Sequence, residues 1–263
     1  MGPVTAAPDT LSCAVVTGAA TGLGAGVATR LLDDGWCVVA ADIDPAVEER
    51  FSAGSFDGRV RSAVVDIAHP DTAAALVNAA MASFGRIDAV INNAGIGGPG
   101  GHLDEVAVDD IQRTLDVNLL GVVRLSQAAI PHLKAQRFGR IVNIGSVFAQ
   151  RPVSNGSAYI MSKAAVHALS QCMAIELGPF NITVNTVAPG YMMTRMHEEE
   201  IELRARTAGV HATEIETQLR DEVPLGRHGC SADVAGAVVW LLSDDAGYVT
   251  GQTIGVNGGI VVS

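Results

Sequence analysis

The sequence predicts an α/β fold in which a doubly wound parallel β-sheet lies between two layers of helices, within a single domain of 263 residues. Three observations predict this fold. Short apolar segments rich in β-branched residues alternate with longer, alanine-rich segments of helical character. The short segments are apolar on both faces, as strands inside a parallel sheet must be. A glycine-rich turn joins the first of these strands to the first helix.

The expected elements follow one another in strict alternation along the chain. The strands are expected at residues 13–17, 37–42, 60–66, 87–92, 140–144 and 182–187. The helices are expected at residues 24–32, 70–83, 108–136, 158–177 and 232–242. A strand that is followed by a helix and then by a parallel strand implies helices on both faces of the sheet.

Residues 191–227 interrupt this alternation with a charged stretch that contains several methionines. We expect an excursion from the sheet rather than a second domain. Two interpretations stay open. The segment is either a pair of solvated amphipathic helices or a mobile lid over a substrate, since loops beyond strand ends often serve that purpose.

Composition and charge disfavour several classes of protein. The net charge of −11 makes a nucleic-acid partner improbable. No apolar run approaches the roughly 20 residues that span a bilayer, and residues 1–12 lack the basic and apolar regions of a signal peptide. We therefore expect no membrane partner and a cytoplasmic location.

The cysteines and histidines show no metal-binding spacing. The four cysteines form no CxxC pair, so each is expected to be a small buried thiol in a reducing compartment. They are Cys13, Cys37, Cys172 and Cys230. The seven histidines are expected at the surface or bound to polar partners, and we expect no metal site.

Residues 17–24 (TGAATGLG) follow the first expected strand and open the first helix. Gly18, Gly22 and Gly24 permit the tight turn and let the backbone approach a pyrophosphate closely. The helix N-terminus adds free N–H groups and a partial positive charge, with Thr21 and Leu23 in the same turn. This strand–turn–helix arrangement predicts a dinucleotide site and a Rossmann-type sheet.

Asp42 ends the second expected strand, 24 residues after Gly18. A carboxylate there can accept hydrogen bonds from the adenosine ribose and would repel a 2′-phosphate. Both chain neighbours of Asp42 are uncharged, as is Thr21 in the turn, so NAD is the expected cofactor. The alternative is that Asp42 or Asp44 caps a helix that begins near Pro45, a role that Asp44 fits better.

Asp66 closes the third expected strand. Its carboxylate could accept a hydrogen bond from the adenine amino group, while Ile67 packs on the ring. Capping of the helix that starts near Pro70 is an equally simple role for Asp66.

Further motifs occur in a fixed order along the chain. They are Asn92-Asn93-Ala94-Gly95, Asn118, Ser146, Tyr159-x-x-x-Lys163 and Pro189-Gly190-x-x-x-Thr194. Together with the turn, this set resembles the short-chain dehydrogenase/reductase superfamily in its simple single-domain form. The resemblance runs from about Leu11 to the C-terminus. The Gly-x-x-x-Gly-x-Gly spacing of the turn distinguishes the chain from the extended, epimerase-like branch.

The resemblance implies roles for these residues. The adenosine and ribose would be bordered by Asn93, Ala94 and Gly95, with Asn92 bracing the sheet. The nicotinamide end would be held by Pro189, Gly190, Met192 and Thr194. The catalytic tetrad would be Asn118, Ser146, Tyr159 and Lys163. The resemblance also implies a homotetramer built on residues 108–136, residues 158–177 and a C-terminal strand.

Tyr159 and Lys163 stand four residues apart, so on a helix they share one face. A phenol with a pKa near 10 is a poor base at neutral pH, but a nearby ammonium and an oxidised nicotinamide would lower that pKa. Ser146 could hydrogen-bond the substrate oxygen, and Asn118 could hold a water that links Lys163 to solvent. Taken singly, each residue also fits an ordinary turn or helix-surface role.

The substrate walls are expected from residues 97–102, 147–153 and 191–227. The candidate lining residues are Ser146, Phe148, Gln150, Tyr159, Tyr191, Met192, Met193 and Met196. An apolar pocket containing methionine suits an aliphatic or alicyclic secondary alcohol or ketone, unless the methionines are core beneath the lid. We therefore expect an NAD-dependent oxidoreductase that interconverts a secondary alcohol and a ketone. A 3-oxoacyl thioester reductase and a non-catalytic dinucleotide-binding sensor or scaffold remain alternatives.

Overall fold

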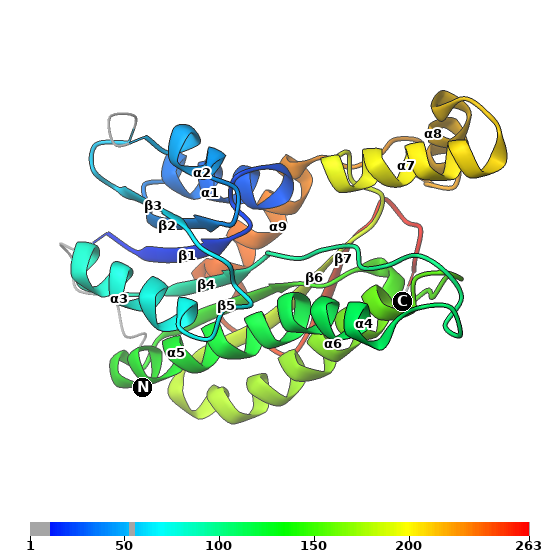
Figure 1. The fold of residues 1–263 in the computed structure, drawn as a ribbon. Helices are drawn as coiled ribbons and strands as arrows, with labels where there is room; N and C mark the ends of the chain where they lie inside the picture. The colour runs from blue at the N-terminus through cyan, green and yellow to red at the C-terminus, as the bar shows by residue number, and fades with distance from the viewer. Residues whose placement is uncertain (1–10, 53–55, 263) are drawn as a thin grey trace.

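The computed structural model of the protein describes residues 11–52 and 56–262. These residues form a central sheet with helices on both faces (Figure 1). Residues 1–10 lie outside the described part. They make up most of residues 1–12, where the sequence predicts that there is no signal peptide. The predicted Rossmann-type, three-layer α/β/α fold is confirmed.

The sheet of the described residues has seven strands, all paired in parallel. They are β1 (Cys13–Thr17), β2 (Cys37–Asp42), β3 (Val60–Val64), β4 (Ala89–Asn92), β5 (Gly139–Ile144), β6 (Ile182–Pro189) and β7 (Thr253–Val256). Their order across the sheet is β3-β2-β1-β4-β5-β6-β7. The chain first builds outward from β1 and then returns to place β4 on its other side. Ligands of open α/β sheets bind at this reversal, beyond the carboxyl ends of the strands.

The helices cover the sheet in two groups, and each group packs through its apolar stripe. The α-helices are α1 (Gly22–Asp33), α2 (Ala46–Arg50), α3 (Thr72–Phe84), α4 (Val108–Leu115), α5 (Gly121–Gln136), α6 (Ser157–Leu177), α7 (Arg195–Ala208), α8 (Ala212–Asp221) and α9 (Ser231–Leu242). Short 3₁₀ turns lie at Val147–Ala149, Gly178–Phe180 and Asp244–Ala246. One core lies between the sheet, α1 and α9, and the other lies between the sheet, α3, α5 and α6.

Most expected elements are present, with two main differences in extent. The third strand stops at Val64, so Asp66 lies beyond it rather than closing it. The helix expected over residues 108–136 is α4 and α5 separated by a π-helical turn at Asp116–Leu120. The helix near Pro45, which the sequence indicated as one that Asp44 would cap, is present as the short α2.

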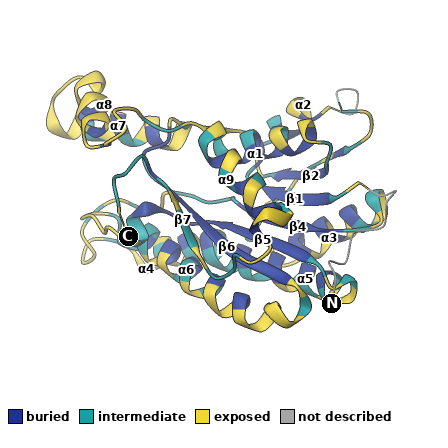
Figure 2. Ribbon diagram, turned by 180° about the vertical axis from the view of Figure 1, so that it is seen from behind, coloured by how far each residue is buried: buried dark blue, intermediate teal, exposed yellow. Residues whose placement is uncertain are grey.

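The excursion at residues 191–227 is a helix pair that projects from one end of the sheet (Figures 1 and 2). α7 and α8 pack on each other around a small buried cluster that includes Ile201, Ala205, Ile215 and Leu219. Their outward faces are exposed (Figure 2). The amphipathic helix pair of the first interpretation is therefore present, while lid movement stays a prediction.

The expectation that all four cysteines are buried is wrong for two of them. Cys13 and Cys37 are buried in the sheet, but Cys172 and Cys230 are exposed. Cys172 lies on the outward face of α6, and Cys230 precedes α9 in a surface loop, so neither occupies a core position. Among the described residues, no helix is both long enough and apolar enough to cross a membrane.

Candidate active site

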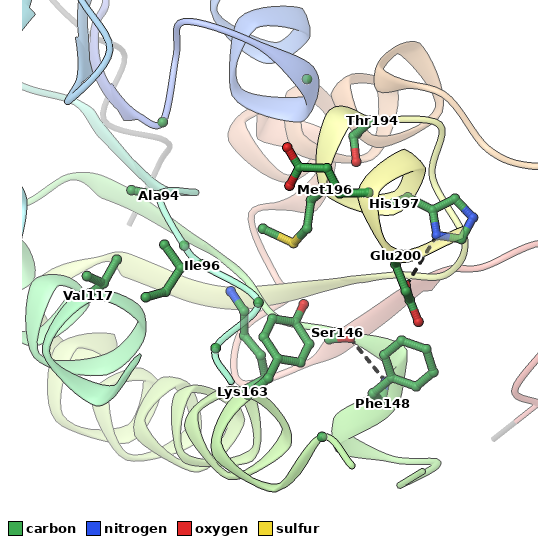
Figure 3. A pocket seen from close by; sticks show the side chains of 18 of the residues that line it. Ala94, Ile96, Val117, Ser146, Phe148, Lys163, Thr194, Met196, His197 and Glu200 are labelled. Carbon is green, nitrogen blue, oxygen red and sulfur yellow. Dashed lines mark hydrogen bonds and ion pairs between the residues drawn. The ribbon is translucent and has the colours of Figure 1, made fainter. Parts of the chain in front are cut away.

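A cavity of about 1790 Å³ lies along the carboxyl ends of the strands. Residues at the ends of five neighbouring strands line it: Thr17, Asp42, Asn93, Ser146 and Gly190. Side chains from α6 and α7 complete the walls (Figure 3). The cavity therefore occupies the position that the sheet reversal predicts for a ligand.

The glycine-rich turn bounds this cavity at the N-terminus of α1. Gly18 and Gly22 have positive φ angles of 67° and 57°, which side-chain-bearing residues rarely adopt. A Cβ on Gly24 would lie 2.1 Å from the Gly18 carbonyl oxygen, so only glycine fits there. Thr21, the N-cap residue, makes no side-chain cap, and Gly22 and Leu23 line the cavity. The helix N-terminus therefore presents backbone N–H groups that suit a pyrophosphate.

A hydrogen-bonded latch joins this turn to the segment after β4. The Thr17 hydroxyl accepts from the backbone N–H groups of Asn93 and Ala94, both at 3.1 Å. In return, the Asn93 amide donates to the carbonyl oxygens of Thr17 and Gly18. The Asn92 amide donates to Asn143 on β5 at 2.7 Å, which agrees with its expected role in bracing the sheet. Asn93 thus holds the turn in shape, and its backbone lines the cavity beside Ala94 and Gly95.

The Asp42 carboxylate lies where the adenosine ribose is expected. It accepts from the backbone N–H groups of Ala20 at 2.8 Å and Asp44 at 3.0 Å, one on each oxygen. Each oxygen keeps a lone pair toward the cavity that it lines. Asp44 instead accepts from the N–H of Ala46 at the start of α2, so the capping role belongs to Asp44.

Arg50, at the end of α2, is a neighbour that the sequence did not reveal. Its guanidinium Nε donates to the Ala20 carbonyl oxygen at 2.7 Å. Asp42 and Arg50 therefore bind the N–H and the C=O of the same residue in the glycine-rich turn. They are eight positions apart in the chain, so inspecting the chain neighbours of Asp42 could not find this cation.

Asp66 and Ile67 also line the cavity, beyond β3. The Asp66 carboxylate accepts from the N–H of Ala68 at 2.8 Å, which closes a local turn. α3 begins only at Thr72, so Asp66 is not its cap, and the capping alternative is wrong. The backbone carbonyl of Asp66 accepts from the Thr72 hydroxyl at 2.7 Å. Ile67 packs on α5 beside Gly121, and contact of either side chain with adenine stays a prediction.

Tyr159 and Lys163 lie on the inner face of α6, and both line the cavity. The Lys163 ammonium is buried, lies 5.8 Å from the centroid of the Tyr159 ring, and donates to the Ile144 carbonyl oxygen at 2.7 Å. Ile144 ends β5, so this hydrogen bond ties the amine to the end of the sheet. Figure 3 shows the Lys163 side chain among the residues that line the cavity. The pairing at i and i+4 that the sequence predicted is present.

The electrostatics of this pair differ from the expected lowering of the tyrosine pKa. Burial raises the pKa of the Tyr159 phenol, a hydrogen bond with Ser146 opposes that rise, and the charge of Glu200 adds to it. Burial also lowers the pKa of Lys163 to about 8. In the protein alone, burial is the largest cause of both shifts, because it disfavours the charged form of each group.

Ser146 follows β5 and is buried. Its hydroxyl accepts from the backbone N–H of Phe148 at 3.1 Å, which caps the 3₁₀ turn Val147–Ala149. The same hydroxyl is hydrogen-bonded to the Tyr159 side chain. The strand end and the cap together hold this hydroxyl beside the phenol.

Asn118 lies in the π-helical turn and is fully buried. Its amide accepts from the Ile96 N–H at 2.8 Å and donates to the Ile96 carbonyl at 2.9 Å and to the Ser162 hydroxyl at 3.0 Å. A Cβ on Gly95 would lie 3.2 Å from the amide oxygen and 3.4 Å from the Lys163 amine. Asn118 thus ties the segment after β4 to α6, and its role toward a water stays a prediction.

The residues expected at the nicotinamide end all line the cavity: Pro189, Gly190, Met192 and Thr194. A Cβ on Gly190 would lie 2.9 Å from the Asn257 Cα, so the chain after β6 packs tightly against the C-terminal segment. Thr194, the N-cap residue of α7, reaches across to the glycine-rich turn, where its Cγ2 would lie 3.4 Å from a Cβ on Gly22. Asp42, the glycine-rich turn and the buried Lys163 amine thus lie along one cavity, an arrangement that fits an extended nicotinamide dinucleotide.

The expected substrate residues are only partly brought together. Phe148 and Tyr191 line the cavity, with ring centroids 6.0 Å apart. Gln150 and Met193 do not line it. Gln150 is exposed at the end of the 3₁₀ turn, and the Met193 sulfur turns toward His228 Nδ1 at 2.9 Å. Placing these two in the pocket was wrong, because side-chain direction beyond a strand end depends on tertiary packing.

Among the cavity residues on α7 that were not predicted from the sequence are three that interact with one another: His197, Glu200 and Arg204. His197 Nδ1 lies 3.4 Å from a carboxylate oxygen of Glu200, and Arg204 pairs with the other oxygen. The His197 ring is buried and stacks on Tyr191, and its contact with Glu200 makes it one of the histidines bound to a polar partner. Their spacing of i, i+3 and i+7 places all three on one helix face, which was the available signal.

Comparison with known proteins identifies the family of the chain. The sequence model of a family described as Enoyl-(Acyl carrier protein) reductase matches residues 18–261. An uncharacterised oxidoreductase of Methylorubrum extorquens is 39% identical, covering 94% of this chain and 96% of the relative. A 3-oxoacyl-[acyl-carrier-protein] reductase of Thermotoga maritima is 35% identical over 94% of this chain and 97% of its own length. A 3beta-hydroxysteroid dehydrogenase of Eggerthella lenta is 36% identical over 94% and 93%, respectively.

Solved structures give the same result. An NAD+-bound xylitol dehydrogenase superposes with a TM-score of 0.88 at 30% identity, covering 96% of this chain and 100% of that chain. A 3-ketoacyl-(acyl-carrier-protein) reductase from Brucella melitensis in complex with NADH superposes with a TM-score of 0.85 at 30% identity, covering 96% and 99%. These relatives share the whole domain of the present chain, its fold and its oxidoreductase chemistry. The chain therefore belongs to the short-chain dehydrogenase/reductase superfamily of oxidoreductases.

Proposed function

We propose that the protein is an NAD-dependent oxidoreductase that interconverts a secondary alcohol and a ketone. The observation that carries this proposal is the grouping of the Tyr159 phenol, the Ser146 hydroxyl and the buried Lys163 amine in the cavity bounded by the glycine-rich turn. Such a reaction moves a hydride to or from the carbinol carbon and a proton to or from the oxygen bonded to that carbon. The protein must therefore hold a proton-transfer group beside the site of hydride transfer.

The residues divide this work between them. The bound nicotinamide accepts or supplies the hydride. In the oxidation direction, the substrate hydroxyl gives its proton to the Tyr159 oxygen as the hydride leaves the carbinol carbon, and Ser146 hydrogen-bonds the substrate oxygen. The Lys163 ammonium favours the phenolate by its charge. Asn118 holds the segment after β4 against α6 through its hydrogen bonds to Ile96 and Ser162. Reduction of a ketone runs through the same steps in reverse.

Asp42 supports the choice of NAD over NADP. Its oxygens keep lone pairs for the two ribose hydroxyls, and its charge would oppose a 2′-phosphate. Arg50 offers the opposite charge nearby, but its Nε is engaged with the Ala20 carbonyl oxygen. We therefore expect the Asp42 carboxylate, rather than the Arg50 guanidinium, to set the preference for NAD over NADP.

This preference can be tested with a panel of secondary alcohols, each assayed with NAD and with NADP. Wild type is expected to favour NAD, and Asp42→Ala is expected to relax that preference because the repulsive charge is gone. Arg50→Ala in the Asp42→Ala background should reduce any gain in NADP use. A wild-type preference for NADP would contradict the proposed role of Asp42.

A 3-oxoacyl thioester reductase is a second candidate, which is favoured by the similarity to the 3-oxoacyl-[acyl-carrier-protein] reductase of Thermotoga maritima and the 3-ketoacyl-(acyl-carrier-protein) reductase of Brucella melitensis. The same tyrosine, serine and lysine would serve that reaction. Assays with a 3-oxoacyl thioester and with simple ketones of similar size separate the two functions. Preference for the thioester by a large factor in kcat/KM would select the second candidate. Dinucleotide binding without turnover of either class would instead favour a sensor or scaffold.

A further inference from the structure

α7 places a carboxylate in the cavity that holds the candidate catalytic tyrosine. Glu200 lines this cavity together with Ser146 and Tyr159, and its charge contributes to the raised pKa of Tyr159. In Figure 3 the Glu200 carboxylate points from α7 toward the wall formed by Ser146 and Phe148. A substrate whose oxygen sits at Ser146 and Tyr159 would therefore have its other end near Glu200.

The carboxylate is held in place from two sides. His197 Nδ1 lies 3.4 Å from one oxygen, and the Arg204 guanidinium pairs with the other. His197 is only 6% exposed, and its ring stacks on Tyr191 with centroids 5.4 Å apart. Although burial opposes it, the hydrogen bond from His197 and the charge of Arg204 lower the pKa of Glu200. Glu200 is therefore an ionised and oriented group that can only accept hydrogen bonds.

The charge balance of the three residues selects the kind of group that they can bind. With a carboxylate as its partner, a neutral His197 carries its proton on Nδ1, so Glu200 and Arg204 cancel. A protonated His197 would make the group positive. In neither case is the group negative, so a cationic substrate gains no net attraction. The carboxylate oxygens would repel an anion at contact, which leaves a neutral donor, such as a hydroxyl group.

We propose that Glu200 is a specificity-determining residue that accepts a hydrogen bond from a second hydroxyl group of the substrate. The protein then acts on diols and other neutral polyhydroxy compounds in preference to monohydric alcohols of the same size. This inference rests on the proposed function, because it assigns the substrate class of the same site. The pocket is also less apolar than the sequence predicted, because the charged Glu200 lines it together with Met192 and Met196.

The inference can be tested with alcohols that share one carbon skeleton. Cyclohexanol is compared with the 1,2-, 1,3- and 1,4-cyclohexanediols, which carry the second hydroxyl at increasing distances from the reacting carbon. We expect at least one diol to exceed cyclohexanol in kcat/KM by roughly 10- to 100-fold, the effect of a hydrogen bond to an ionised partner. The gain should appear mainly in KM if the bond is equally strong in the ground and transition states.

Two variants and a matched control isolate the contribution of Glu200. Glu200→Gln removes the charge and Glu200→Leu removes the acceptor, so the diol advantage should shrink in the first and vanish in the second. Glu202→Gln changes a glutamate on the same helix that pairs with Arg206 and does not line the cavity. This control should keep the full advantage. Glu200→Gln should also move the acid limb of the pH–rate profile to lower pH for every substrate, because a negative charge near Tyr159 is lost.

The possible outcomes separate the two proposals. Equal efficiency of wild type on cyclohexanol and all three diols would overturn the inference and leave the proposed function intact. An equal loss for cyclohexanol and diols in both Glu200 variants would also overturn it, because that pattern indicates a structural role for α7. Absence of turnover of any secondary alcohol in the wider panel would overturn the proposed function and the inference with it.

Discussion

At Lys163 the fold buries a primary amine that donates a hydrogen bond to a backbone carbonyl, that of Ile144. Burial lowers its pKa to about 8, well below the ordinary value of 10.5. Proteins rarely bury a lysine without paired charge, and they tolerate one where chemistry requires it. The unfavourable burial is thus a cost in stability that the proposed proton-transfer role explains.

This cost predicts a specific pH dependence of stability. Between pH 8 and 10.5 the unfolded chain holds a proton that the folded protein has released, so unfolding becomes harder as pH rises. Relative to Lys163→Met, the free energy of unfolding of wild type should increase across this window by up to about 3 kcal/mol. Denaturant unfolding of both proteins without cofactor, at several pH values, measures it. A difference that does not change with pH would show that the amine is not held in a desolvated state.

Some residues of the site could be predicted from the sequence, and others could not. Tyr159, Lys163 and Ser146 were named because they match a family motif, and the spacing on α6 and the end of β5 agree with that motif. Arg50 was missed because its contact with Ala20 joins two separate elements. His197 and Glu200 were missed because a helix with many charged residues reads as solvated, and only packing on Tyr191 reveals which face turns inward.

At the scale of elements, the glycine-rich turn depends on one close approach between β1, α1 and the segment after β4. A Cβ on Gly24 would lie 2.1 Å from the Gly18 carbonyl oxygen and 2.4 Å from the Asn93 amide nitrogen. These partners are backbone and a side chain already engaged with the turn. Neither can move without opening the latch between Thr17 and Asn93.

We therefore expect Gly24→Ala to weaken dinucleotide binding and to lower the melting temperature. Gly236→Ala is the matched control, because Gly236 is an exposed helical glycine with no atom within 4 Å of a built Cβ. That substitution should leave binding unchanged and stabilise α9 by up to about 1 kcal/mol. Calorimetric titration with NAD and thermal unfolding of both variants give the comparison. Wild-type affinity in Gly24→Ala would contradict the fit of the turn to the cofactor.

Periodicity located the strands and most helices because buried parallel strands and amphipathic helices leave strong patterns. The break between α4 and α5 left no such pattern in the sequence, since the π-helical turn continues directly from one helix into the next. This turn places Asn118 against Ile96, and π-helical turns of this kind often occur at functional sites. α2 was indicated only by Asp44 and Pro45 before it, because five residues are too few to show a helical period.

For the whole molecule, the resemblance to the short-chain dehydrogenase/reductase superfamily implies a homotetramer. The surface of the chain is compatible with such an assembly. Val108 on α4 and Met161 and Ile175 on α6 are exposed apolar side chains on the two long helical segments named for that contact. Light scattering is expected to give four times the mass of one chain. A mass of one chain at assay concentration would contradict this expectation. Ile175→Glu, at 80% exposure, should favour smaller species.

The central claim is that the Tyr159 hydroxyl transfers the proton while NAD takes the hydride. Its most direct test measures Tyr159→Phe twice, for NAD binding and for turnover of the best alcohol in the panel. Tyr248→Phe is the control, because Tyr248 is fully exposed. We predict unchanged NAD binding in both variants and a loss of turnover in Tyr159→Phe alone, by roughly 100- to 10,000-fold. Turnover by Tyr159→Phe at the rate of wild type would contradict the account.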